Sequence, residues 1–346
     1  MFLKYSDMWD MRLGSAPESD PGVREIPHWF GNLAYVAVGG AFKLCFRYRV
    51  DHREKLRAFQ GESGVLVVCN HTSFLDVCFM YLTARTSQWM RLMGRESLFD
   101  NAGGLLGQIL SRVGAFPVKR DSADRTSIKR AARMLKRREI VGILPEGTRR
   151  GKGSKASEIH SGAALVARMG HAPILPMTVR NAEYVKQKGQ RVRFPKITIE
   201  YGDPVLLEDF DFLPKDDRLD GCTWYAMREC FALSQQVPPE QVDMRALFPT
   251  GKDFTDVFAA HPVPRHTSEE VVAAIRAERA EKERKAAARA QEAAEKEAAP
   301  ATAGGGATQD AAGGATDAAG AVSAAAPATG GATADADAVA TGGEGA

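Results

Sequence analysis

The stretch Asn70-His-Thr-Ser-Phe-Leu-Asp76 places a histidine and a carboxylate five residues apart, directly after the apolar run 64–69. A buried strand followed by a helix predicts that His71 stands at a strand end, where α/β sheets carry their active-site residues. A neutral imidazole accepts a proton from a hydroxyl near pH 7, and a carboxylate such as Asp76 fixes its tautomer and stabilises the imidazolium. Because the chain has no G-x-S-x-G motif, the pair predicts direct attack by a substrate hydroxyl without an acyl-enzyme.

The same spacing also has a purely structural interpretation. Ser73 and Asp76 are separated like the two ends of a capping box, and an aspartate in the first turn of a helix is stabilised by the helix dipole. His71 would then be an ordinary loop residue. The motif by itself leaves the catalytic and the structural interpretations both open.

A second polar segment, LPEGTRRGKG at 144–153, begins at the end of the apolar run 139–145. Gly147 permits a close backbone approach or a positive φ, and Arg149 carries a planar fork that fits a phosphate with two hydrogen bonds. Glu146 is suited to hold that fork or to accept a hydroxyl proton. A polar turn is the alternative explanation. The absence of a G-x-x-x-x-G-K-[ST] pattern argues against a nucleotide P-loop.

Segments with strand and helix patterns alternate around these two motifs. The predicted strands are 64–69, 115–120, 139–145, 172–179 and 196–202, and the predicted helices are 73–84, 105–113, 122–138, 161–169 and 218–236. Such an alternation is typical of an α/β fold, a layered sheet flanked by helices. Both polar segments then follow strands of that sheet.

Residues 1–49 are predicted to form an N-terminal membrane-associating helical segment. Its charge-free stretch 29–42 spans only about 21 Å as a helix, which is shorter than the roughly 30 Å hydrocarbon core of a bilayer. Its aromatic residues suit a membrane interface, and the cations that follow suit an anionic surface. These residues are Trp29, Phe30 and Tyr35, and Lys43, Arg47 and Arg49. The stretch predicts an interfacial or re-entrant anchor; the alternative is a buried helix whose glycines pack closely.

The domain that carries both polar segments is predicted to span 50–237, followed by an irregular, proline-containing extension at 238–266. A capping-box pattern, Thr267-Ser-Glu-Glu270, opens a long charged helix predicted at 267–299. Residues 300–346 are rich in Ala, Gly and Thr and lack aromatic residues. They bury no core and are predicted to be a disordered tail.

Composition restricts the class of protein. The chain has 346 residues, a formal net charge of +3 and five cysteines without a C-x-x-C pair. With no signal peptide at its start, we expect a reduced, cytoplasmic protein that holds no metal and no cofactor. The basic run 119–138 either attracts phosphates or is a solvated helix face. Because that run has no aromatic residues to stack on bases, nucleic acid is not expected as a partner.

Four short segments occur in a fixed order between residues 45 and 236. They are His-x4-Asp at 71–76, a Gly- and Leu-rich segment from Gly94 to Arg120, Pro-Glu-Gly-Thr-Arg at 145–149, and an apolar strand with a proline at 174–179. In kind, order and interval they resemble the motifs of the lysophosphatidic acid acyltransferase family, the 1-acylglycerol-3-phosphate acyltransferases of the glycerophospholipid acyltransferase superfamily. The resemblance leaves the charged helix and the tail unexplained.

The resemblance implies that His71 is the general base and that Asp76 orients it. The acyl donor would be a thioester of CoA or of acyl carrier protein, and the acceptor the free hydroxyl of 1-acyl-glycerol-3-phosphate, giving phosphatidic acid. The substrate-binding residues that it implies are Glu146, Gly147, Thr148, Arg149, Arg120, Asn70 and Ser73. The protein would lie at the cytoplasmic face of the cell membrane, as a peripheral or monotopic protein in contact with the phospholipid surface.

Two departures from the family pattern leave the acceptor open. Gly103-Gly104 stands where the family often has proline, and the segment 159–162 reads Ile-His-Ser-Gly where the family often has Phe-Lys-x-Gly. The residues available to replace the missing cation are Lys152, Lys155 and His160. Another lysolipid, such as a lyso-ornithine lipid or another lysophospholipid, is therefore an alternative acceptor. A non-catalytic membrane-binding adaptor is a further alternative, against which the complete set of chemically competent motifs argues.

Overall fold

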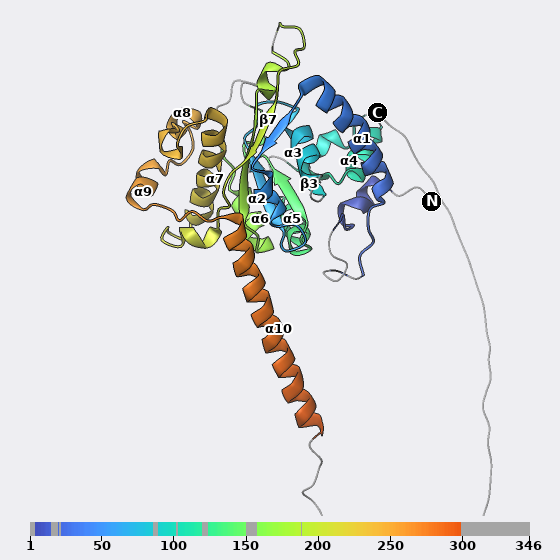
Figure 1. The fold of residues 1–346 in the computed structure, drawn as a ribbon, viewed down its shortest axis with the longest axis vertical. Coiled ribbons are helices and arrows are strands. Elements are labelled where there is room, and N and C mark those ends of the chain that lie inside the picture. The colour runs from blue at the N-terminus through green and yellow to red at the C-terminus, as the bar shows by residue number, and fades with distance from the viewer. Residues whose placement is uncertain are drawn as a thin grey trace, which may run out of the picture. The chain divides into compact units, whose positions relative to one another are not determined.

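In the computed structural model, a seven-stranded sheet with helices on both faces organises Met1–Arg289, the first of two compact units (Figure 1). The second unit is Ala290–Ala346. The structure describes residues 4–14, 20, 22–85, 89–101, 103–119, 124–149, 158–187 and 189–298. The predicted α/β layered sheet is confirmed.

The strands follow the order β1-β7-β6-β2-β5-β3-β4 across the sheet. Their bounds are β1 Arg49–Asp51, β2 Val65–Cys69, β3 Met90–Arg95, β4 Phe116–Val118, β5 Ile140–Ile143, β6 Ile174–Arg180 and β7 Thr198–Tyr201. Neighbouring strands are parallel, except that β6 and β7 are antiparallel. Since β2 and β5 are parallel neighbours, the segments that follow them leave the sheet at the same edge.

The helices cover the two faces of this sheet. The α-helices are α1 His28–Phe46, α2 Arg53–Arg57, α3 Asp76–Ala84, α4 Leu105–Arg112, α5 Arg125–Lys136, α6 Gly162–Gly170, α7 Arg218–Gln235, α8 Met244–Leu247, α9 Thr255–Ala260 and α10 Ser268–Ala298. Short 3-10 helices are η1 Tyr5–Trp9, η3 Glu96–Leu98, η4 Ala182–Tyr184, η5 Leu207–Phe210 and η6 Pro239–Gln241. Figure 1 shows α7, α8 and α9 on one side of the sheet and α1, α3 and α4 on the other.

Strand β2 is buried along its whole length because it supplies side chains to both faces. Val65, Val67 and Cys69 belong to one core cluster, which includes residues of α1 and α3. Leu66 and Val68 belong to the other, which includes residues of α5, α6 and α7. This alternation is the period of two expected for a strand. Because β2 is the central strand of the sheet, the residue after Cys69 lies at the centre of the sheet edge.

Sequence reasoning missed β1 and β3. β1 has only three residues, two of them charged, and β3 contains Arg91 and Arg95, so neither shows the continuous apolar run of a buried strand. The Arg91 guanidinium is fully buried and donates to the carbonyls of Trp9 and Met11 at 3.0 and 3.2 Å. The carbonyls of the N-terminal segment and an ion pair with the buried Glu139 at 3.7 Å make a charged residue acceptable at that position.

Three cations of the basic run, on α5 and at its C-terminal end, form ion pairs within the protein. Asp10 accepts hydrogen bonds from Arg130 and Arg133 at 3.0 and 2.8 Å, and Arg137 forms an ion pair with Asp20 at 2.7 Å. These three cations therefore hold the segment before α1 against the sheet. They were predicted to attract phosphates or to form a solvated face, and the structure gives them carboxylate partners.

Helix α1 has one packed face and one exposed face, and both are apolar. Gly31 lies so close to Trp89 that a Cβ atom there would be 2.5 Å from the ring, and Gly39 packs on Leu82. The exposed face carries Trp29, Leu33, Val36 and Leu44. Among the described residues, no helix is both long and apolar enough to cross a membrane. The sequence left a closely packed helix and an interfacial helix as alternatives. In the structure the closely packed glycines and the exposed apolar row lie on opposite sides of the same helix.

The extension at 238–266 contains α8 and α9 and packs on α7. The ring of Phe258 lies 5.5 Å from that of Trp224 and 5.4 Å from that of Tyr225. Phe248 is likewise paired with a ring of α7. The helical pattern of this extension was not recognised from the sequence because its two helices have only four and six residues.

The capping box that opens α10 forms as predicted. Thr267 N donates to Glu270 Oε2 at 2.8 Å, and Glu270 N donates to Thr267 Oγ1 at 3.2 Å. Val271 and Val272 are buried in the core that α1 and α3 share, whereas residues 280–294 are all exposed. The tail predicted at 300–346 lies outside the described residues.

Candidate active site

The strand β2 and the helix α3 bring His71 and Asp76 together. His71 Nδ1 lies 3.0 Å from Asp76 Oδ2. The Asp76 side chain is fully buried, whereas 13% of the His71 side chain is exposed. The two residues predicted to be the base and its orienting partner are thus in contact, and part of the imidazole remains accessible.

Asp76 Oδ2 also closes the turn that leads into α3. It accepts hydrogen bonds from the backbone amides of Thr72 and Ser73, both at 2.8 Å. Ser73 Oγ in turn accepts from Leu75 N at 3.3 Å. One carboxylate oxygen therefore makes the capping contact and the histidine contact, so the two interpretations of this motif are compatible.

Burial is the largest influence on Asp76 and raises the pKa of its carboxyl group. The hydrogen bonds from His71, Thr72 and Ser73 oppose that rise because they favour the ionised form. Glu183 lies near this carboxylate, and its pKa is raised by its own burial and by the charge of Asp76. A buried carboxylate held beside a histidine is typical of a functional site.

Glu146, which follows β5, supports the histidine from the neighbouring strand. Its side chain is buried, and its Oε1 accepts a hydrogen bond from His71 N at 2.8 Å. The sequence suggested that Glu146 would hold Arg149 or accept a substrate proton. The structure gives one of its oxygens a contact with the main chain of the candidate base, and its role in substrate binding stays a prediction.

The third motif forms a tight turn around Gly147, which has a φ of 64°. Gly147 N donates to Leu144 O at 3.0 Å, and His160 N donates to Pro145 O at 3.1 Å. The His160 ring lies beside the glycine, 3.4 Å from the place of a Cβ atom. His160 is thus next to the turn where the family often has a cation close by in the sequence.

The remaining predicted substrate residues have different environments. Thr148 is exposed, and Arg149 is partly buried without an ion pair to any described residue. Arg120, Lys152 and Lys155 lie outside the described residues. The substrate roles of these residues stay predictions.

Asn70 has a buried side chain that is engaged within the protein, and its predicted role in substrate binding stays a prediction. Asn70 Oδ1 accepts a hydrogen bond from Thr178 Oγ1 at 2.8 Å. Thr178 is a supporting residue that sequence reasoning missed, although it lies in the apolar strand identified as the fourth motif. Its signal was a polar residue within a strand that is otherwise apolar before Arg180.

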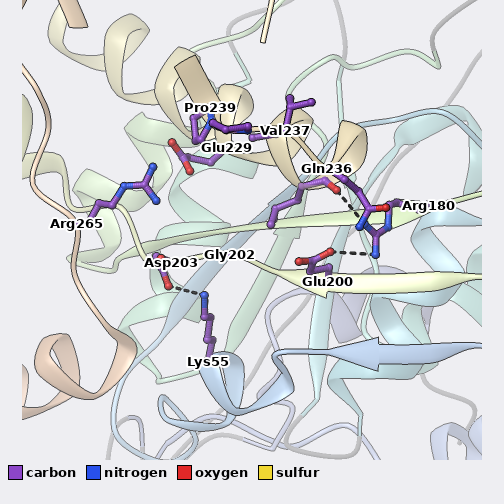
Figure 2. Close-up of a pocket in the computed structure, with 13 residues that line it drawn as sticks. Lys55, Arg180, Glu200, Gly202, Asp203, Glu229, Gln236, Val237, Pro239 and Arg265 are labelled. Carbon is purple, nitrogen blue, oxygen red and sulfur yellow. Dashed lines mark hydrogen bonds and ion pairs between the residues drawn. The ribbon is translucent and has the colours of Figure 1, made fainter. Parts of the chain in front are cut away.

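A separate polar hollow of about 340 Å³ lies between α7 and the β6–β7 pair (Figure 2). Two ion pairs occupy its wall: Lys55 with Asp203 at 2.5 Å and Arg180 with Glu200 at 3.1 Å. Neither His71 nor Asp76 lines it. The charged groups of these two pairs neutralise one another, so the hollow does not replace the His71–Asp76 pair as the centre for chemistry.

Comparisons with known proteins identify relatives of this chain. A family model described as Acyltransferase matches residues 47–180, which include His71, Asp76 and Glu146. The 1-acyl-sn-glycerol-3-phosphate acyltransferase of Bacillus subtilis (strain 168) is 32% identical over 175 residues, covering 51% of this chain and 82% of the relative. The protein of the same name from Streptococcus pneumoniae (strain ATCC BAA-255 / R6) is 26% identical, covering 43% of this chain and 52% of the relative.

Among solved structures, the 1-acyl-sn-glycerophosphate (LPA) acyltransferase PlsC from Thermotoga maritima is similar, with 18% identity and a TM-score of 0.45. That similarity covers 59% of this chain and 79% of the PlsC chain. On the extent and identity of the Bacillus match, the chain belongs to the 1-acyl-sn-glycerol-3-phosphate acyltransferase family. The predicted family is confirmed, and the chain is an acyltransferase.

Proposed function

We propose that the protein transfers a fatty acyl group from a thioester of CoA or acyl carrier protein to the free hydroxyl of 1-acyl-glycerol-3-phosphate, forming phosphatidic acid. The observation that carries the proposal is the 3.0 Å contact between His71 Nδ1 and the buried Asp76 Oδ2 at a central strand end. The relatives from Bacillus subtilis and Streptococcus pneumoniae, which bear the name of this activity, support the choice of acceptor.

The proposed reaction uses the free nitrogen of the imidazole. With Asp76 ionised, His71 Nδ1 carries the ring proton and donates it to Oδ2, so Nε2 is the base. Nε2 takes the proton of the acceptor hydroxyl while the hydroxyl oxygen attacks the thioester carbonyl carbon. The tetrahedral intermediate then loses the thiolate, which recovers the proton from the imidazolium. Both charges are neutralised, and no acyl-enzyme is formed.

The phosphate of the acceptor is proposed to bind at the turn after β5. Glu146 and His71 N are hydrogen-bonded, so this turn and the base are held in a fixed relation. Arg149 has no competing ion pair with a described residue, and its planar fork suits a phosphate. His71, the proposed proton acceptor, and Arg149, the proposed phosphate ligand, are therefore proposed to contact the same acceptor molecule.

The substrates are lipids, and we propose that the protein works as a peripheral or monotopic protein at the cytoplasmic face of the membrane. The exposed row of α1 carries Trp29, Leu33 and Val36, large apolar residues that suit an interface. Phe74, between His71 and Asp76 in the sequence, is also exposed. An interfacial position would let a lipid hydroxyl reach His71 without leaving the membrane surface.

The decisive experiment measures thiol release from an acyl-CoA by the purified full-length chain, with and without 1-acyl-glycerol-3-phosphate. Release that depends on the lysolipid, with phosphatidic acid as product, is expected. A panel with lyso-ornithine lipid and other lysophospholipids identifies the preferred acceptor, and acyl carrier protein thioesters test the donor. Failure of every lysolipid to accelerate release, with His71→Ala as the matched inactive control, would contradict the proposal.

A further inference from the structure

The segment 181–197, which joins β6 to the antiparallel β7 and is termed the β6–β7 loop, combines exposed cations with exposed apolar side chains. The exposed cations are Lys186, Arg191, Arg193 and Lys196, and the exposed apolar residues are Tyr184, Val192 and Phe194. Its sequence contains one acidic residue, Glu183. Such a mixture is typical of surfaces that meet an anionic lipid interface.

The positive charge of this loop is not neutralised within the part of the chain that the structure describes. None of its four exposed cations forms an ion pair with a described carboxylate, and Lys186 Nζ donates to the carbonyl of Gln190 at 2.9 Å. At the start of the loop the situation is different, because Arg180 pairs with Glu200 at 3.1 Å. The exposed cations therefore remain available to an external anion.

Backbone contacts hold the loop in a defined shape. Asn181 Nδ2 donates to Lys196 O at 2.9 Å, and Arg193 N donates to Val185 O at 2.9 Å. Val185 is buried beneath these contacts. Because the loop is closed at its base and across its middle, its side chains are presented outward without a large additional ordering cost on binding.

The loop lies between the exposed helix α1 and the candidate active site. The Phe194 ring is 5.5 Å from that of Phe46, the last residue of α1, and Ile197 N donates to Phe46 O at 3.3 Å. At the other end of the loop, Glu183 is close enough to Asp76 for the charge of Asp76 to raise the pKa of Glu183. Figure 1 shows this segment rising beside the C-terminal end of α1.

We propose that the β6–β7 loop is a second membrane contact, in which its cations bind the phosphates of anionic lipid headgroups and Val192 and Phe194 enter the interface. The contact of Phe194 with Phe46, the last residue of the helix that carries an exposed apolar row, favours a bilayer as the occupant. Cations spread along an exposed loop suit a field of headgroups, whereas one substrate phosphate requires a convergent fork. The inference rests on the proposed function only in taking a bilayer as the source of the substrate.

The test compares binding of the full-length chain to vesicles of neutral phosphatidylcholine and to vesicles that also contain phosphatidylglycerol. The loop variant is Lys186→Gln, Arg191→Gln and Arg193→Gln. Each cation near an anionic surface contributes roughly fivefold to partitioning, so the variant is expected to bind the anionic vesicles at least about tenfold more weakly. Its binding to neutral vesicles is expected to stay unchanged.

The matched control removes the same charge from the exposed part of α10, with Arg284→Gln, Lys285→Gln and Arg289→Gln. This control is expected to bind both kinds of vesicle like wild type. Equal binding of the loop variant and the control to anionic vesicles would overturn the proposal. Acyl transfer in detergent micelles is expected to be unchanged in the loop variant. A loss of acyl transfer as large as the loss of vesicle binding would assign the cations to the substrate phosphate and would also overturn the proposal.

A second measurement is independent of any loss of charge. In a Val192→Trp variant, lipids with brominated chains are expected to quench more fluorescence than in wild type when the vesicles are anionic. No additional quenching would contradict insertion of the loop. Neither vesicle measurement requires acyl transfer, so an inactive protein that still binds through this loop would refute the proposed function and leave this inference standing.

Discussion

Asp76 Oδ2 holds three donors at once, His71 Nδ1 and the amides of Thr72 and Ser73. In Asp76→Asn, an amide oxygen in the same place can still accept these bonds, but the charge that stabilises the imidazolium is lost. Positioned general-base catalysis is worth about 10²–10⁴-fold, so kcat for acyl transfer is expected to fall at least about a hundredfold, as in His71→Ala. The double variant is expected to be little worse than either single one, because the pair acts as a unit. Multiplicative losses would show that the two residues act independently.

Asp76→Asn is expected to lower activity but to raise the stability of the protein relative to wild type as the pH rises. Burial raises the pKa of Asp76 in the folded protein, so the stability contributed by its protonated form is full at low pH and is lost as the pH rises through the folded pKa. The melting temperature of Asp76→Asn relative to wild type is therefore expected to increase from about pH 4 to pH 7, across the range above the usual pKa of an aspartate. A variant that becomes relatively less stable over this range would mean that the carboxylate is mainly structural.

Glu146 is expected to act through the position of His71. Glu146→Gln retains an oxygen that can accept from His71 N, whereas Glu146→Ala removes it and leaves a partly buried amide without this partner, a loss of roughly 1–3 kcal/mol at most. We expect kcat to fall by no more than about tenfold in the Gln variant and by clearly more in the Ala variant. Steady-state kinetics of both variants, with thermal melting as the folding control, check this. Equal losses in the two variants would assign a charge-dependent role to Glu146.

Arg149 is expected to act through the geometry of its guanidinium. Arg149→Lys retains the positive charge but loses the bidentate fork. A hydrogen bond to a charged group is worth roughly 1.5–3 kcal/mol, so kcat/KM toward a phosphate-bearing acceptor is expected to fall about tenfold or more. The same variant assayed with a lysolipid that lacks the phosphate is the control. Near-normal kinetics of the Lys variant with both acceptors would remove Arg149 from the phosphate site.

At the scale of elements, the packed face of α1 is expected to contribute to folding and its exposed apolar face to membrane contact. Deletion of residues 1–44 would also remove buried core residues such as Met8 and Leu13, so point changes on the exposed face are the cleaner test. Leu33→Glu with Val36→Glu is expected to reduce partitioning onto vesicles at least about tenfold, with stability within about 0.5 kcal/mol of wild type. Ala273→Glu with Ala274→Glu, on the exposed side of α10, is the charge-matched control. Equal partitioning of both variants would exclude α1 as an anchor.

At the scale of the whole molecule, the C-terminal residues are expected to be dispensable for chemistry. Truncation after Arg289 removes only the second compact unit, and truncation after His266 also removes the buried Val271 and Val272. Burial of one such side chain is worth roughly 1.5–3 kcal/mol, so only the shorter protein is expected to melt at a clearly lower temperature. Both are expected to retain the specific activity of the full chain, measured well below their melting temperatures. A tenfold loss in the Arg289 truncation would show that the tail takes part in the reaction.

Local chemistry was predictable from the sequence. The His71–Asp76 contact joins residues five apart across a strand-to-helix turn, and the Thr267–Glu270 cap joins residues three apart. In both cases backbone geometry alone brings the groups together. The four motifs and the alternation of strands and helices likewise determined the family and the α/β fold. The interfacial character of residues 29–42 was inferred from the length and charge of that stretch and stays a prediction.

Only the tertiary structure decided how distant residues support that chemistry. Glu146 meets His71 across 75 positions because β5 and β2 are parallel neighbours, and Thr178 meets Asn70 across 108 positions because β6 lies on the other side of β2. The strand order that creates these contacts depends on which apolar faces are buried together. The strand order is a property of the whole core. The alternation of side chains along a strand determines which residues lie on each of its two faces, but it does not determine which strands become its neighbours.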